Sequence, residues 1–157
     1  MLFQTTPEHE ALRAKIRAFA EEEIKPIAFL LDQQNEFPED AVRKLGEMGL
    51  MGIPYPKEYG GAGLDILSYA IAVEELARVD GGSGVILSAH VSLGSWPIFA
   101  FGTEAQKQKY LVPLAKGEKI GQVGSSGAAT PAPSRYSAAA SIRDSRRSSS
   151  PSPSIRQ

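Results

Sequence analysis

Histidines, carboxylates and clustered glycines are the features of this 157-residue sequence that could do chemistry. The two histidines, His9 and His90, lie in different predicted helices, and neither has an Asp or Glu at a spacing typical of a metal site or a catalytic triad. We expect His9, in the first turn of a helix, to be a solvated surface residue. His90 lies in an apolar segment, where a buried imidazole must find a hydrogen-bond partner or face a cavity. A satisfied interior histidine is therefore the favoured interpretation of His90.

The adjacent carboxylates Glu74 and Glu75 could suggest a pair for acid–base chemistry. Neighbouring helix positions point about 100° apart, however, so the two carboxylates cannot face one substrate atom together. A solvated face or an ion pair with Arg78 is the expected role. The glycine clusters at 60–63 and 81–84 follow no predicted strand and match no phosphate-binding fingerprint, so they are predicted to be turns. The sequence has no cysteine, which excludes a thiolate nucleophile or metal ligand. We assign no catalytic, cofactor-binding or metal-binding residue from these patterns.

Apolar residues at helical spacing predict five helices that must position any such site. The first begins with Pro7 at its first position, and Pro26 predicts a kink or a break. The segment 85–101 has no charged side chain, and its part before Pro97 fits a helix buried on nearly all sides at the centre of the domain. No alternating strand pattern precedes Lys119. We expect an all-α fold, a helical bundle of about five helices. The other predicted helices span about 38–49, 66–79 and 103–117.

The end of the sequence differs in composition from the rest. Residues 122–157 hold five arginines against one aspartate, eleven serines and four prolines, which leaves a net charge of +4 there and about −5 before it. Such a segment cannot bury enough apolar area to fold, so we predict a disordered Ser/Arg/Pro-rich tail. The overall charge of −1 argues against a nucleic-acid partner. No run approaching about 18 uncharged apolar residues is evident, so no membrane partner and a cytoplasmic location are expected.

Three motifs in order resemble the N-terminal helical domain of acyl-CoA dehydrogenases of the short- and medium-chain type: IPYPKEYGGAGLD at 53–65, VEELARVD at 73–80 and FGTEAQKQKYLVPLAKGEKIG at 101–121. The resemblance covers about residues 2–121 and defines a domain at 1–121. It implies a flavoenzyme that abstracts an α-proton from an acyl-CoA and passes the β-hydride to FAD, with an electron-transfer flavoprotein as partner. It also implies that Ala89, His90 and Leu93 line the acyl pocket as substrate-binding residues.

After Gly121 the sequence departs from the family pattern, which continues there into a flavin-contacting loop, a β-domain and a second bundle that supplies the catalytic base. The resemblance therefore implies a fragment that is inactive alone and does not hold FAD by itself. Apolar faces that meet those missing parts predict self-association. A Ser/Arg/Pro-rich tail is also what a GC-rich gene yields when read out of frame. We hypothesise a frameshift or truncation, which sequencing the gene beyond the codon for Gly121 tests.

A second interpretation stays open at the level of sequence. The helical domain could be a non-catalytic interaction module that carries a basic Ser/Arg-rich disordered arm, in which serines follow Arg146 and Arg147 directly. The arm has Tyr136 as its only aromatic residue, so it lacks the stacking ladder of a nucleic-acid binder.

Overall fold

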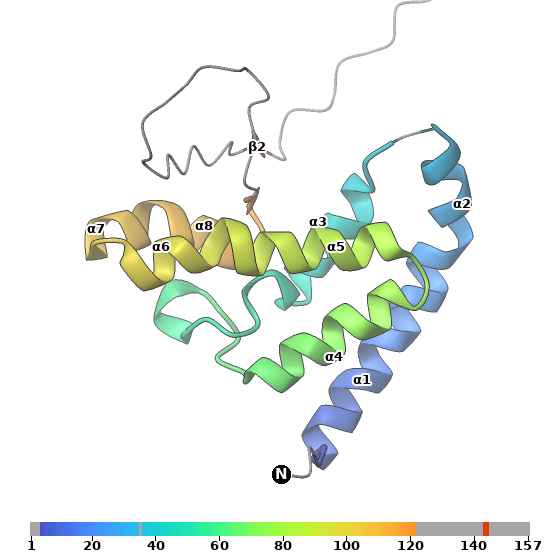
Figure 1. Ribbon diagram of the computed structural model, residues 1–157, viewed down its shortest axis with the longest axis horizontal. Helices are drawn as coiled ribbons and strands as arrows, with labels where there is room; N and C mark the ends of the chain where they lie inside the picture. The colour runs from blue at the N-terminus through green and yellow to red at the C-terminus, as the bar shows by residue number, and fades with distance from the viewer. Residues whose placement is uncertain (1–3, 35, 122–142, 145–157) are drawn as a thin grey trace, which may run out of the picture.

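The computed structural model describes residues 4–34, 36–121 and 143–144, and within them the helical segments join into five rods (Figure 1). The rods are 7–34, formed by α1 (Pro7–Phe19), the π-helical stretch η1 (Ala20–Ile24) and α2 (Lys25–Gln34); 39–47, formed by α3 (Glu39–Glu47); 66–77, formed by α4 (Ile66–Ala77); 81–101, formed by α5 (Gly81–Ala89), η4 (His90–Ser95) and α6 (Trp96–Phe101); and 104–115, formed by α7 (Glu104–Gln106), η5 (Lys107–Leu111) and α8 (Val112–Ala115). The all-α prediction of about five helices is confirmed.

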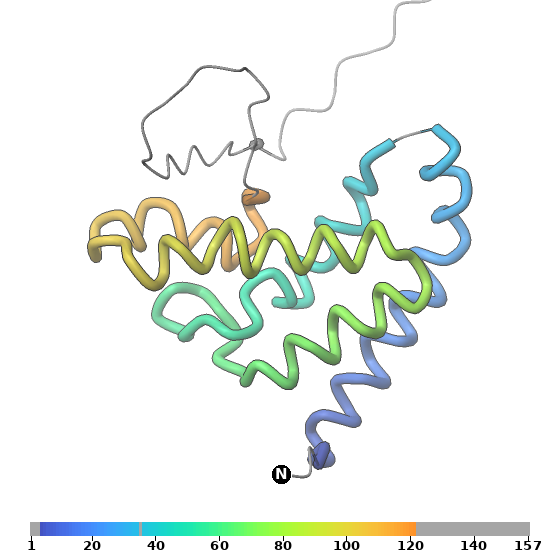
Figure 2. The backbone as a smooth tube through the Cα atoms, in the orientation of Figure 1, coloured from blue at the N-terminus to red at the C-terminus, as the bar shows by residue number. Residues whose placement is uncertain are grey.

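Short non-helical segments complete the described chain. Two 3-10 turns, η2 (Leu50–Gly52) and η3 (Lys57–Tyr59), shape the loop between α3 and α4. β1 (Lys119–Ile120) pairs antiparallel with β2 (Arg143–Asp144), with Lys119 opposite Asp144. Apart from β2, the predicted disordered tail at 122–157 lies outside the described residues. Figure 2 shows the 81–101 rod crossing the molecule, with α4 packed beside it and α1 packed on α4.

Local sequence signals set the ends of these helices. Thr6 caps α1 by accepting a hydrogen bond from the His9 backbone N–H, and Pro7 is the first helical residue. Thr103 and Gln106 form the expected capping box at the start of α7. The expected glycine stop at Gly49 adopts a left-handed conformation with φ of 76°. The hydrophobic core then forms where the apolar stripes of the rods meet, and its most deeply buried aliphatic residues include Ile16, Ile24, Leu45, Met51, Ile53, Leu76, Leu87, Leu111 and Leu114.

Prolines inside the rods do not break them, so the alternative of a break at Pro26 is wrong. Pro26, Pro97 and Pro113 are each the second residue of the helical segment that follows a π-helical stretch. In a regular α-helix the proline ring clashes with the carbonyl four residues earlier. The wider π turn, seen in the Lys25 N–H bond to the Ala20 carbonyl five residues back, relieves that clash and lets the rod continue.

The glycines at 81–84 begin a helix, so the prediction of a turn there is wrong. The Asp80 side chain accepts hydrogen bonds from the backbone N–H groups of Gly82 and Ser83 and caps α5. Gly84 is needed for close packing, because a Cβ at this position would lie 2.7 Å from the Cβ of Ala77 on α4. The cap and the close approach of α4 to α5 outweigh the entropy that glycine loses in a helix.

The part of the 81–101 rod before Pro97 is not buried on nearly all sides, and that prediction is also wrong. Leu87 is fully buried, but Val85 is 66% exposed and Leu93 is 53% exposed. The run Gly81–Phe101 reaches a mean hydropathy of 1.4 over 18 residues, which is long and apolar enough for a membrane span by length and composition alone. The expectation that no run approaches that limit is therefore wrong as well. Core helices of soluble proteins pass the same test, and one face of this rod packs on α4.

Candidate functional site

The 81–101 rod carries all three residues that the sequence predicts to line an acyl pocket, and it presents them on two different faces. Ala89 is half-buried and Leu93 is 53% exposed, one helical turn apart. His90 is fully buried. The structure therefore brings Ala89 and Leu93 together at the surface and turns the His90 ring toward the interior.

Both ring nitrogens of His90 bind backbone groups. Nδ1 accepts a hydrogen bond from the Gly121 N–H at 3.0 Å, which leaves the proton on Nε2. Nε2 then donates to the Leu114 carbonyl at 3.2 Å. Burial lowers the pKa of His90 to about 4, against smaller opposing effects of backbone contacts with Leu114 and Met51. His90 is thus a neutral interior histidine, as favoured from sequence, and it ties the rod to α8 and to the residue after β1.

The same junction depends on two glycines in contact. A Cβ built on Gly94 would lie 2.6 Å from the backbone carbonyl carbon and oxygen of Gly121. Together, the His90 hydrogen bonds and this close approach fix where the chain leaves the helical domain after β1.

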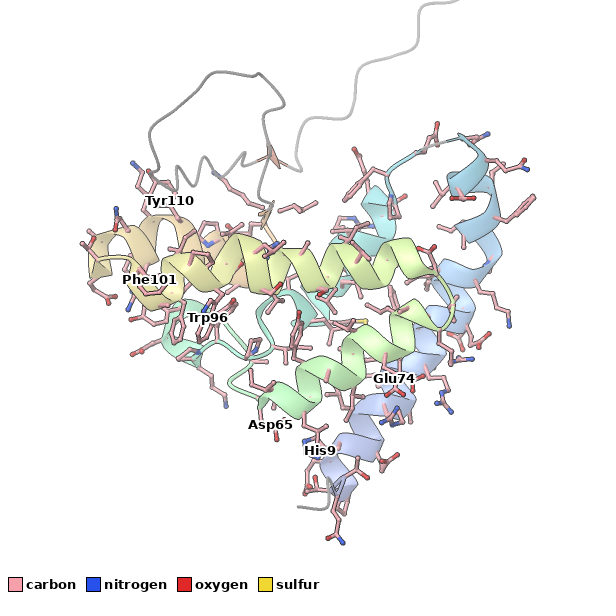
Figure 3. The ribbon with its side chains drawn as sticks, in the orientation of Figure 1. His9, Asp65, Glu74, Trp96, Phe101 and Tyr110 are labelled. Carbon is pink, nitrogen blue, oxygen red and sulfur yellow. The ribbon has the colours of Figure 1, made fainter. Side chains whose placement is uncertain are left out.

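Opposite this junction the rod shows an uncharged apolar surface, here called the α5–α6 face. It comprises Val85, Ala89, Leu93, Trp96 and Phe101, and no residue of the 81–101 rod has a carboxylate or a cationic side chain. Trp96 is 48% exposed, and Figure 3 shows Trp96 and Phe101 at the α6 end of the rod. Such a face can provide a wall for an apolar ligand, but it supplies no proton acceptor.

An aromatic cluster holds α6 against the glycine-rich loop that follows α3. The Phe99 ring lies 5.4 Å from Tyr55, 5.6 Å from Trp96 and 6.2 Å from Tyr59, measured between ring centroids. The Lys107 ammonium lies 5.5 Å from the Phe99 centroid and 5.7 Å from that of Tyr59. These contacts fix the orientation of α6 and thereby of the α5–α6 face.

His9 is buried, and the prediction of a solvated surface residue is wrong. Its Nδ1 accepts from the Thr6 backbone N–H at 3.1 Å, so Nε2 carries the proton and donates to the Asp65 carboxylate at 3.0 Å. Figure 3 shows the two side chains meeting where α1 and α4 begin. Hydrogen bonds from Ser68, followed by the contact with His9, lower the pKa of Asp65 to about 2. The pair joins two helix starts that lie 56 residues apart in the sequence.

Glu75 is a buried carboxylate held by arginines of another helix. Its side chain is 1% exposed, and it accepts hydrogen bonds of 2.8 Å from both Arg13 and Arg17 of α1. The expected partner Arg78 lies 3.5 Å away and is secondary. The hydrogen bonds from Arg17, with those from Arg13, lower the pKa of Glu75 to about 2 against the effect of burial. A carboxylate so strongly bound is a poor proton acceptor, so Glu75 joins α1 to α4 and is no general base.

Two adjoining hollows lie between the end of α2 and the start of α3, with volumes of about 400 Å³ and 280 Å³. Their linings include carboxylates and, among the described residues, no lysine or arginine. The pyrophosphate of a dinucleotide is anionic and requires donors or cations. The lining of these two hollows therefore does not fit FAD.

Comparisons with known proteins place these features in a family. The family model for the acyl-CoA dehydrogenase N-terminal domain matches residues 6–118. A short-chain specific acyl-CoA dehydrogenase of Clostridium acetobutylicum is 60% identical over 124 residues, which cover 79% of this chain and 33% of that protein. The chain thus spans about one third of the length of this relative.

Solved structures give the same result. A chain in the structure described as the electron transferring flavoprotein of Acidaminococcus fermentans matches with a TM-score of 0.74 and 44% identity, over 81% of this chain and 34% of that one. An acyl-CoA dehydrogenase of Bacillus anthracis, solved in complex with FAD, matches with a TM-score of 0.69 and 38% identity, over 74% of this chain and 20% of that one.

Proposed function

Because this chain belongs to the acyl-CoA dehydrogenase family through its N-terminal domain, we propose that it contributes that domain to the FAD-dependent α,β-dehydrogenation of short-chain acyl-CoA thioesters. The relative with the short-chain specificity supports the substrate class. The solved relative with FAD supports the cofactor, which accepts the substrate hydride when bound.

The observation that carries the proposal is the α5–α6 face. Ligand sites for apolar groups are lined mostly by hydrophobic side chains, and a wall without charges suits an acyl chain. Ala89 and Leu93 lie on this face, so we propose that they contact the acyl chain. His90 supports the face from behind, since its ring binds Leu114 and Gly121.

The described helices provide the wall and neither the base nor the flavin site. The α5–α6 face has no carboxylate. Glu75, whose side chain is 1% exposed, is neutralised by Arg13 and Arg17. Proton abstraction and hydride transfer need both groups held beside the substrate. We therefore propose that a polypeptide of this sequence alone does not dehydrogenate acyl-CoA.

Two partners follow from the proposal. An electron-transfer flavoprotein is the proposed electron acceptor of the complete enzyme, supported by the Acidaminococcus fermentans structure. A second copy of this chain is the proposed partner of the exposed α5–α6 face when no other domain covers it.

A chimera tests the function directly. Residues 1–121 replace the matching segment of the Clostridium acetobutylicum relative, and reduction of an electron-accepting dye is followed with butyryl-CoA. The chimera is expected to bind FAD and reduce the dye, whereas the chain alone does neither. A chimera that folds and binds FAD but leaves the dye oxidised contradicts the proposed role, and so does substrate-dependent dye reduction by the chain alone.

A further inference from the structure

The region between α2 and α3 is an acidic and apolar surface to which the proposed function assigns no role. The two adjoining hollows share Leu31, Glu36, Phe37 and Pro38 in their linings, and we call them together the α2–α3 hollow. Phe37 is 45% exposed and Ile27, at its edge, is 36% exposed. The hollow therefore offers apolar contacts to a side chain that enters it.

Two carboxylates at the hollow differ from most others in the domain in their ion pairing. Glu21, Glu23 and Glu47 form salt bridges with lysine or arginine side chains. The side-chain carboxylates of Asp32 and Glu36, by contrast, have no hydrogen bond or ion pair with any of the described residues. Their charges are thus left for a cation from elsewhere.

The remaining carboxylates at the hollow, those of Glu39, Asp40 and Asp80, are already engaged. Asp40 lies 3.4 Å from Arg43, Asp80 caps α5, and Glu39 also has an interaction partner. They add negative potential without competing for a new cation. An occupant with guanidinium groups and short apolar side chains fits this combination best, because a guanidinium pairs with carboxylates and also packs on aromatic faces.

This chain itself carries such a segment. Residues 145–157 read SRRSSSPSPSIRQ, which contains Arg146, Arg147, Arg156 and Ile155 and no acidic residue. The segment follows β2 directly, and β2 is paired with β1 on the helical domain. Thirteen residues extend to about 45 Å at ~3.5 Å each, which exceeds the ~30 Å diameter of a small domain. Figure 1 places β1 and the α2–α3 end along the same upper edge of the molecule.

We propose that residues 145–157 dock in the α2–α3 hollow of the same chain, with Arg156, which the extended segment carries farthest from β2, paired to Asp32 and Glu36. Attachment through β2 makes the contact intramolecular, and a short tether gives a millimolar effective concentration. Contacts between exposed charges are screened by salt, so the docked state weakens as ionic strength rises.

Paramagnetic relaxation in the full chain tests this docking. The sequence has no cysteine, so Ser150→Cys gives one site for a nitroxide label. We expect the label to broaden the amide signals of residues 27–41 more than those of residues 104–106 on α7. Reduction of the nitroxide or high salt restores the signals.

Matched charge variants separate docking from nonspecific attraction. Glu36→Gln weakens the broadening at 27–41, whereas Glu58→Gln, which removes one exposed carboxylate of η3, leaves it unchanged. In a mixture of isotope-labelled chain without nitroxide and unlabelled chain with it, no broadening at 27–41 is expected. Broadening that is absent from 27–41, equal for the two variants, or undiminished in the mixture overturns the proposal. Unchanged amide positions elsewhere show that each variant is folded.

Discussion

Replacing Glu75 by glutamine removes the charge that joins α1 to α4 and should destabilise the domain more than any surface charge change. The fall in the pKa of Glu75 from 4.5 to about 2 corresponds to about 3 kcal/mol, at ~1.4 kcal/mol for each pH unit. Arg17 is 52% exposed, so water screens part of this interaction. We expect Glu75→Gln to lower the free energy of unfolding by about 2–3 kcal/mol at pH 7.

Urea unfolding followed by circular dichroism measures this loss as a midpoint shift of about 0.7–3 M, for a slope of about 1–3 kcal/mol/M. The matched control is Glu74→Gln, whose carboxylate is 63% exposed and should contribute about 1 kcal/mol or less. A carboxylate with a lowered folded pKa contributes fully above its unfolded pKa and loses the contribution as pH falls. The gap between wild type and Glu75→Gln should therefore shrink between pH 4.5 and pH 2. Equal losses for the two variants at pH 7, or a gap that does not change with pH, would refute the reasoning.

Three further predictions concern the 81–101 rod. His90→Phe should leave the Gly121 N–H without its acceptor and lower the free energy of unfolding by about 1–3 kcal/mol. Because burial lowers the pKa of His90 to about 4, the stability of the wild type should fall between pH 6.5 and pH 4, and that of the variant should fall less. Urea unfolding across this pH range checks the difference. Gly94→Ala should lower the stability of the domain by about 1–3 kcal/mol, because the new Cβ overpacks against Gly121. Gly81→Ala, whose Cβ meets nothing within 4 Å, should raise the stability by roughly 0.5–1 kcal/mol. A thermal melt in which the two substitutions shift the midpoint equally would disprove this packing. Phe101→Ser should reduce concentration-dependent self-association measured by light scattering, and a wild-type chain that stays monomeric at all concentrations would rule the association out.

Local signals in the sequence predicted the ends and inner faces of the helices. Thr6 and Pro7 mark the start of α1, and Ile16 and Ile24 are buried as their spacing requires. These predictions succeed because caps and periodicity depend on residues within one or two turns.

Long-range contacts could not be predicted in the same way. His9 is buried because α4 brings Asp65 to it, and Glu75 meets arginines about 60 residues earlier in the sequence. No spacing rule within one helix shows such pairs. For the same reason, the apolar composition of 81–101 could not show which of its faces the neighbouring helices cover.

The candidate site was predicted in part. At 100° per residue, His90 lies about 100° from Ala89 but only about 60° from Leu93, so regular helix spacing could not have separated the imidazole from Leu93. The π-helical stretch η4, which begins at His90, changes that spacing in the structure. Its two backbone partners, Leu114 and Gly121, depend on how the last helix and β1 return to the rod. The lining of an acyl pocket by Ala89, His90 and Leu93 stays a prediction.

The steady-state kinetics of the chimera with Leu93→Glu test most directly whether the α5–α6 face forms the acyl wall. Phe29→Glu on α2, at a side chain 73% exposed, is the matched control. A charge placed against the acyl chain should lower kcat/KM for butyryl-CoA by at least about 10-fold, while FAD content and the control's kinetics stay unchanged. Equal kcat/KM for the two variants, at equal FAD content, would contradict the account.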